Sequence, residues 1–105
     1  MQPDVKIIEE VVQRVRNVVN PLRIILFGSA SRGNMQSESD LDILVVVPEG
    51  THKRKAAQHI CREMIGVDIA VDVVVATENI LEKHKDNWSL VYYSALRDGR
   101  EIYAA

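Results

Sequence analysis

Apolar positions recur along the first quarter of the chain with two different periods, and each period predicts one kind of element. In residues 4–20, apolar side chains stand at every third or fourth position among charged ones, which is typical of an amphipathic helix. Pro21 ends this helix, because proline lacks the backbone N–H that a helix interior needs. Residues 22–27 are then apolar except for Arg23, and the run stops at Gly28, so it predicts a largely buried strand.

The middle of the chain predicts a loop, a strand and a helix. Polar residues fill 29–39, which indicates a loop with one helical turn. The β-branched run 41–47 predicts a second strand. Thr51 is the expected N-cap of the helix that follows, and Gly66 stands where a left-handed cap ends a helix. The apolar face of this helix consists of Ala56, Ile60 and Met64.

The last third of the chain predicts one more strand among short helices. The β-branched run 67–75 predicts the third strand, and residues 77–84 predict a short helix with Thr77 as its cap. Residues 90–96 predict a further helix, and after a glycine turn residues 101–103 are expected to pair as a short edge strand. These elements favour an α/β fold, a small mixed sheet flanked by helices, with a core in the order αβαβα.

Length, composition and net charge indicate a single folded domain and argue against a nucleic-acid-binding protein. A length of 105 residues fits one domain, which we expect to span 1–105. An apolar fraction of 47% against 27% charged residues is ordinary for a folded protein. Thirteen basic and fifteen acidic residues give a formal net charge of -2, which offers no general attraction for a polyanion. Nucleic acid is therefore not predicted as a main partner.

Cysteine usage and hydropathy indicate the compartment. Cys61 is the only cysteine, so no internal disulfide can form, and a reducing environment is expected. The N-terminal residues do not resemble a secretion signal, and no apolar run approaches the roughly 20 residues that a membrane span needs. We therefore expect a cytoplasmic protein with no membrane segment.

Three aspartates carry the pattern of a divalent metal site. Asp40 and Asp42 stand two apart at the start of the second strand, so their side chains project from the same face. Two like charges there are costly unless a cation lies between them. Asp72 lies within the third strand, where a carboxylate has no packing role, and it is the expected third ligand. Carboxylate oxygens suit Mg²⁺ or Mn²⁺.

The segment after the first strand carries groups that suit a phosphate. Gly28 lets backbone N–H groups approach a phosphate, and the hydroxyl of Ser29 can donate to it. Arg32 can hold triphosphate oxygens through its planar guanidinium, and Gly33 keeps the loop compact beside it. Together with the aspartates, these residues predict a metal–triphosphate site.

The sequence resembles the DNA polymerase β-like nucleotidyltransferase superfamily in three ordered motifs. The motifs are Gly28-Ser29-Ala30-Ser31-Arg32-Gly33, Ser39-Asp40-Leu41-Asp42 and Val71-Asp72-Val73. The resemblance covers nearly the whole chain, and it is greatest to the minimal nucleotidyltransferases of prokaryotes, including their antitoxin branch. One position departs from the commoner pattern, which has alanine where this chain has Ser31.

The resemblance implies a fold and a catalytic site. It implies the nucleotidyltransferase (polymerase β-like) fold and two divalent metal ions, Mg²⁺ with Mn²⁺ as a substitute. Asp40 and Asp42 are expected to bind both ions, and Asp72 to complete one site and help activate the attacking hydroxyl. Gly28 and Ser29 are expected to hold the β- and γ-phosphates.

The resemblance also implies a reaction and a partner. We expect transfer of a nucleoside monophosphate, AMP from ATP, to a hydroxyl acceptor with release of pyrophosphate. Family members of this size often act as antitoxins that modify a tyrosine of a helical HEPN toxin, so a HEPN-type protein is the expected partner. The alternative is a non-catalytic antitoxin that neutralises a HEPN partner by occlusion. Transfer to a small molecule such as an aminoglycoside is a third possibility, although enzymes of that kind carry a further helical domain.

Several other residues admit simpler interpretations. Asp68 shares the period of Asp72 along the third strand, but its place beside Gly66 favours a solvated strand start. The run Lys53-Arg54-Lys55 is typical of a solvated helix face. The spacings of the histidines and Cys61 match no zinc pattern. Residues with a predicted role in core packing or a homo-oligomer contact are Trp88, Tyr92 and Tyr93.

Overall fold

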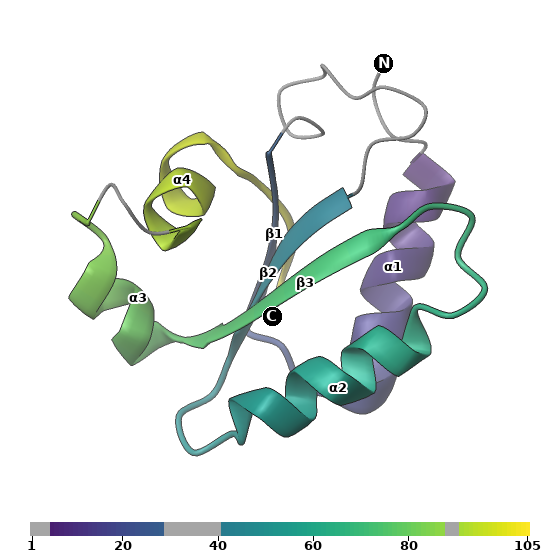
Figure 1. Ribbon diagram of the computed structural model, residues 1–105, viewed down its shortest axis with the longest axis horizontal. Helices are drawn as coiled ribbons and strands as arrows, with labels where there is room; N and C mark the ends of the chain where they lie inside the picture. The colour runs from purple at the N-terminus through teal and green to yellow at the C-terminus, as the bar shows by residue number, and fades with distance from the viewer. Residues whose placement is uncertain (1–4, 29–40, 88–90) are drawn as a thin grey trace.

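The computed structural model describes residues 5–28, 41–87 and 91–105, which form a sheet with helices on both faces (Figure 1). Of the helices in these ranges, none combines the length and apolar character that a membrane crossing requires. The elements in chain order are α1 (Val5–Val18), β1 (Arg23–Phe27), β2 (Leu41–Val47), α2 (Lys53–Glu63), β3 (Val71–Thr77), α3 (Glu78–His84), α4 (Val91–Asp98) and β4 (Arg100–Ala104).

The sheet is mixed, with the strand order β3-β2-β1-β4. β1 pairs antiparallel with both β2 and β4, whereas β2 and β3 run parallel. Parallel neighbours need a crossover, and α2 provides it. The predicted α/β class and mixed sheet are therefore confirmed.

Both faces of the two central strands are covered, which explains their nearly continuous apolar sequence. Alternate side chains of β1 and β2, such as Ile24 and Ile43, pack against α1 and α2. The intervening ones, such as Ile25 and Leu44, form a second cluster with α3 and α4. Figure 1 shows the two helix pairs on opposite sides of the sheet.

The crossover helix is fixed to the first helix by one arginine. Arg14 of α1 donates from Nη1 to the carbonyl oxygens of Glu63 (2.5 Å) and Ile65 (2.9 Å) at the end of α2. Its Nη2 donates to Glu10 at 2.9 Å. The final carbonyls of a helix have no partner within the helix, so these bonds satisfy groups that α2 alone leaves open. They hold α2 in the position from which the chain returns to the sheet.

Several predicted details are confirmed. The second strand has the predicted bounds 41–47. Ala56, Ile60 and Met64 are buried, as the expected apolar face of α2 requires. Thr77 caps α3, since its hydroxyl accepts the backbone N–H of Ile80 at 3.4 Å.

The predicted N-cap of α2 is wrong by one residue. His52 is the cap, and its Nδ1 accepts the backbone N–H of Lys55 at 3.3 Å. Thr51 instead closes a turn by donating its N–H to the carbonyl of Pro48 at 3.2 Å. Gly50 has φ +89°, as the third position of a type II turn requires, so the helix can begin only after this turn.

The predicted start of the third strand is also wrong. The sequence pattern predicts a strand over residues 67–75, whereas β3 spans Val71–Thr77. Val67 and Ile69 belong to the connection from α2, where their side chains pack against the core beneath α1 and α2. A β-branched run has the same appearance in a buried connection as in a strand, because both bury apolar side chains.

The order of elements in the described residues is αββαβααβ rather than αβαβα. β1 and β2 are antiparallel neighbours and need no crossover, so two strands precede α2. The predicted edge strand is present and extends over Arg100–Ala104.

Two isoleucines near the end of α2 test how far this packing supports the fold. Ile60 is 0% exposed and Ile65 is 78% exposed. Ile60→Ala should lower the free energy of unfolding by about 2 to 5 kcal/mol, because it removes a core side chain and leaves a cavity. Ile65→Ala should change it by no more than about 0.5 kcal/mol. Urea unfolding of the two variants measures the difference, and equal losses would contradict the described packing.

Candidate functional site

The parallel register of β2 and β3 places Asp42 directly beside Asp72. Each is the second residue of its strand, and neighbouring strands lie about 4.8 Å apart. By alternation, Asp42 shares a sheet face with Leu44, which packs with α3 and α4. Asp72 shares that face with Val74. Two carboxylates from segments thirty residues apart therefore lie on one face at one end of the sheet.

The end of β1 closes this site from the other side. Phe27, the last residue of β1, pairs with Asp42, so Gly28 follows at the same end of the sheet. On the side of β3, the backbone N–H of Leu41 donates to the carbonyl of Ala70 at 2.9 Å. This bond fixes the start of β2 against the start of β3. Three strand ends thus hold Asp42, Asp72 and Gly28 in one small region.

Glycine is required at position 28 for two reasons. Its φ is +73°, in the left-handed region that side chains with a Cβ rarely adopt. A Cβ built there would also lie 2.5 Å from Oδ2 of Asp42. The space in which the Asp42 carboxylate lies therefore exists because residue 28 has no side chain.

The electrostatics of the carboxylate pair favour a cation. Like charges directly beside each other on neighbouring strands destabilise a sheet. Asp42 is half-buried and Asp72 is exposed, and none of the ion pairs in the described ranges involves Asp72. A divalent ion bound by oxygens of both carboxylates would offset their repulsion.

The structure locates only part of the predicted site. It describes Gly28, Asp42 and Asp72 and brings them together. Asp40, Ser29 and Arg32 lie outside the described residues. Sequence reasoning gave Gly28 a role toward phosphate, but it missed the close approach of Gly28 to Asp42. The available signal was a glycine placed immediately after an apolar strand.

Asp68 lies in the connection before β3 rather than in the strand. It therefore has no register partner on β2, whereas Asp72 lies opposite Asp42. Two of the three histidines considered for zinc have other contacts: His52 caps α2, and the ring of His84 stacks on Tyr92 with centroids 6.2 Å apart. No group of three or more potential metal ligands gathers within the described part of the chain.

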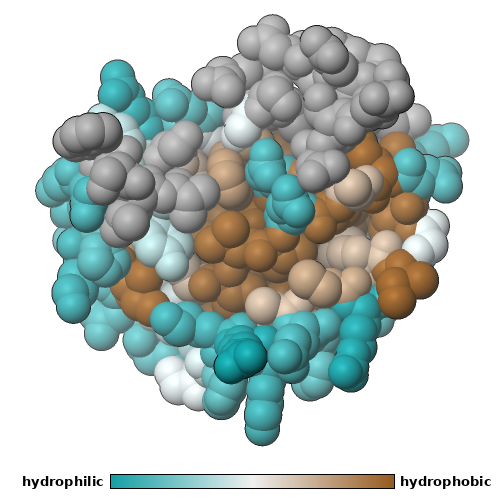
Figure 2. Space-filling view, in the orientation of Figure 1, coloured by the Kyte–Doolittle hydropathy of each residue, from teal (hydrophilic) through white to brown (hydrophobic). Residues whose placement is uncertain are grey.

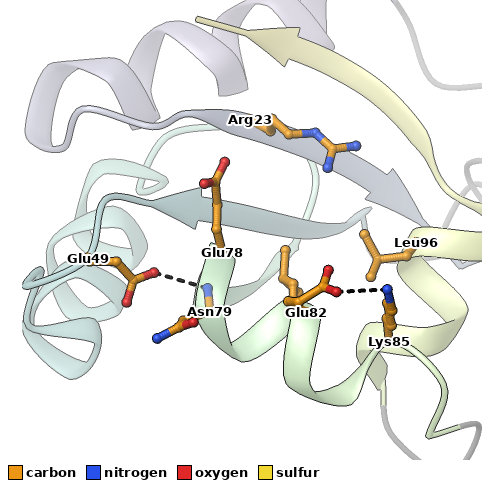
Figure 3. A pocket seen from close by; sticks show the side chains of 8 residues that line it. Arg23, Glu49, Glu78, Asn79, Glu82, Lys85 and Leu96 are labelled. Carbon is orange, nitrogen blue, oxygen red and sulfur yellow. Dashed lines mark hydrogen bonds and ion pairs between the residues drawn. The ribbon is translucent and has the colours of Figure 1, made fainter.

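A pocket of about 560 Å³ lies at the opposite end of the sheet from the carboxylate pair (Figure 3). Several of its polar groups have partners nearby: Glu49 accepts the backbone N–H of Asn79 at 3.0 Å, and Lys85 pairs with Glu82 at 2.8 Å. The hydrogen bond to Glu82 raises the pKa of Lys85. Arg23, also in the wall, pairs with Glu101 of β4 at 2.7 Å. The pocket contains none of the predicted site residues.

The sequence matches the family described as Nucleotidyltransferase domain over residues 5–99, a range that includes all three motifs. A relative from Methanocaldococcus jannaschii, provisionally named a protein adenylyltransferase, is 34% identical over 82 residues. The alignment covers 77% of this chain and 77% of the relative.

Solved structures share the fold at lower sequence identity. One is a chain from a toxin–antitoxin crystal structure with AMP-PNP, with a TM-score of 0.58 and 20% identity over 93% of this chain and 73% of that chain. Another belongs to the structure of a tri-AMPylated Shewanella oneidensis HEPN toxin in complex with an MNT antitoxin. It has a TM-score of 0.55 and 18% identity over 95% of this chain and 71% of that chain. These similarities confirm the predicted fold.

Proposed function

Because the chain belongs to the nucleotidyltransferase domain family, we propose that Asp42 and Asp72, together with Asp40, form its catalytic site. The observation that carries this proposal is the register of β2 and β3, which places the half-buried Asp42 beside the exposed Asp72 on one sheet face. The family acts on nucleotides, and the carboxylate pair is the described feature best suited to bind a metal–nucleotide complex.

The proposed reaction transfers a nucleoside monophosphate. The oxygen of an acceptor hydroxyl attacks the α-phosphorus of a nucleoside triphosphate, and the bond from that phosphorus to the oxygen bridging to the β-phosphate breaks. Pyrophosphate leaves with the electron pair of this bond. The carboxylate of Asp72 accepts the proton of the hydroxyl, because Asp72 is the exposed member of the pair.

The donor set fits Mg²⁺ or Mn²⁺. Two carboxylates from neighbouring strands offer hard oxygen ligands, and Gly28 leaves space beside Asp42. We propose two ions, with Asp40 and Asp42 as ligands to both and Asp72 as ligand to one. When bound, such ions neutralise phosphate charge and assist the leaving pyrophosphate.

Residues after β1 are proposed to hold the triphosphate. Gly28 and Ser29 would bind the β- and γ-phosphates through N–H and hydroxyl donors. Arg32 would orient the same phosphates through its guanidinium. The support for this part is the position of Gly28, which lies against Asp42 and therefore beside the proposed metal ions.

ATP is the proposed nucleotide, and a protein hydroxyl is the proposed acceptor. The M. jannaschii relative carries the name of a protein adenylyltransferase, and a structure of similar fold holds AMP-PNP. Another similar structure contains an AMPylated HEPN toxin with its antitoxin. We therefore propose that this chain acts in the cytoplasm as an antitoxin that transfers AMP to a tyrosine of a HEPN-type partner.

Three aspartate variants test the catalytic assignment. The chain is incubated with Mg²⁺, ATP labelled on its α-phosphate and a candidate HEPN-type partner protein, and label on protein is measured. Asp42→Asn and Asp72→Asn should lower transfer on the order of 100-fold or more, because each removes a charge that stabilises the transition state. Asp68→Asn is the matched control, since Asp68 is exposed and lies outside β3.

Each outcome of this assay has a separate meaning. Undiminished transfer by Asp42→Asn would show that the carboxylate pair is not the catalytic site. Absence of label with the wild-type chain, together with a tight complex with the HEPN-type protein, would favour neutralisation by occlusion instead.

Two glycine variants test the contact between Gly28 and Asp42. Gly28→Ala and Gly50→Ala both place a Cβ at positive φ, which costs about 1 to 2 kcal/mol of stability. Only at Gly28 does the new Cβ meet Asp42, because nothing lies within 4 Å of a Cβ at Gly50. Displacement of the carboxylate should lower transfer by up to about 100-fold in Gly28→Ala alone. Equal transfer by the two variants, at matched stability, would contradict this role of Gly28.

A further inference from the structure

β3 lies at one edge of the described sheet, so one side of its backbone has no described strand beside it. Its one neighbour among the described strands is β2. Because Leu41 donates its N–H to the carbonyl of Ala70, the backbone groups of alternate residues from Ala70 onward point toward β2. The N–H and C=O groups of Val71, Val73 and Val75 therefore point outward. They offer a ladder of donors and acceptors to an added strand.

The two edges of the sheet differ in how they are protected. β4, at the opposite edge, has the sequence REIYA, with Arg100 and Glu101 as charges, and its register with β1 shifts between Ile24 and Ile25. Charges and register irregularities are the features that prevent unwanted strand pairing. β3 has the sequence VDVVVAT, without a basic residue or a proline, and its ladder with β2 is regular. The edge formed by β3 therefore has a single acidic residue, Asp72, and neither the basic residue nor the register shift of the other edge.

Apolar side chains surround this edge. Figure 2 shows an apolar area in the middle of the view, where β3 faces the viewer in Figure 1, with hydrophilic residues around it. Half-buried apolar side chains of β3 itself, Val71, Val73 and Val74, pack against the two core clusters. An added strand would cover such side chains on both faces of the sheet.

We propose that the outer edge of β3 binds an extended segment of the acceptor protein as an additional strand, which brings its hydroxyl residue to Asp72. This inference rests on the proposed function, since it specifies how the acceptor reaches the carboxylate pair. A strand added at about 4.8 Å from β3 would run directly beside Asp72. Asp42 lies one strand further in, on the side of Gly28. The acceptor thus approaches from the edge and the nucleotide from the β1 side.

Charge restricts the segment that can bind. Asp72 is the only charged residue of β3. Like charges on neighbouring strands repel, so the segment residues nearest Asp72 must be neutral or basic. An apolar segment that carries a tyrosine and basic rather than acidic neighbours meets this requirement. A second copy of this chain, paired through its own β3, is the competing occupant.

The first test measures binding without catalysis. The probe is a nine-residue peptide with a central tyrosine, alternating threonine and valine on each side and a lysine at each end. Amide hydrogen exchange of the Asp42→Asn chain is followed with ATP and Mg²⁺ present. Amide exchange at Val71 and Val73 should slow at least about tenfold with saturating peptide. Exchange at Val74 should not change, because the N–H of Val74 points toward β2. The same peptide with N-methyl groups on the residues that face β3 should have no effect.

The second test uses the active chain and label transfer to the peptide. Val73→Pro removes one outward N–H that the ladder with β2 does not use, so the strand should persist and transfer should fall at least about tenfold. Val73→Thr is the matched control, because it retains the N–H and should retain transfer. Unchanged exchange at Val74 shows that Val73→Pro is folded.

The outcomes separate this inference from the proposed function. Slowed exchange at Val71 and Val73 without any label transfer supports edge binding and argues against the transferase. Label transfer that Val73→Pro does not reduce, with no slowed exchange, overturns edge binding and leaves the transferase intact. Slow exchange at Val71 and Val73 before peptide is added, in a chain that sediments as a dimer, also overturns the proposal, because a second copy then occupies the edge.

Discussion

The parallel register of β2 and β3 is the constraint on which the site depends. If β3 paired with β2 one residue out of this register, the side chain of Asp72 would lie on the opposite sheet face, away from Asp42. The register is set by the crossover helix α2, whose Ile60 is completely buried beneath the sheet. Arg14 adds a second restraint, because it ties the end of α2 to α1 just before the chain turns into β3. Residues far from the carboxylates therefore determine where the carboxylates lie.

The same region combines stabilising and destabilising features. The inner strands are buried on both faces, and this burial provides the main favourable contribution to folding. At one end of these strands, the repulsion between the two neighbouring carboxylates opposes stability. Such features persist where the surrounding structure determines them and where they serve a function. A bound cation and nucleotide would convert the repulsion between Asp42 and Asp72 into a binding interaction.

Local patterns predicted the parts of the fold that local forces determine. The bounds of β2, the buried face of α2 and the Thr77 cap follow from side-chain period and short-range hydrogen bonds. The start of β3 could not be located, because Val67 and Ile69 bury apolar side chains without joining the ladder. The cap at His52 depends on the turn before it, which the sequence does not place to a single residue. Local patterns cannot predict the strand order or the contact of Gly28 with Asp42, because both arise only when distant segments meet. The roles of Asp40, Ser29 and Arg32 stay predictions.

Binding of Mn²⁺ measures most directly whether the carboxylate pair is a metal–nucleotide site. Electron paramagnetic resonance would follow Mn²⁺ in the presence of a non-hydrolysable ATP analogue, for the wild-type chain, Asp42→Asn and the control Asp68→Asn. We expect the wild-type chain and Asp68→Asn to bind Mn²⁺ with equal affinity, and Asp42→Asn to bind it about tenfold to 100-fold more weakly. Equal binding by all three chains would contradict the account, because the register of β2 and β3 would then have no part in holding the metal.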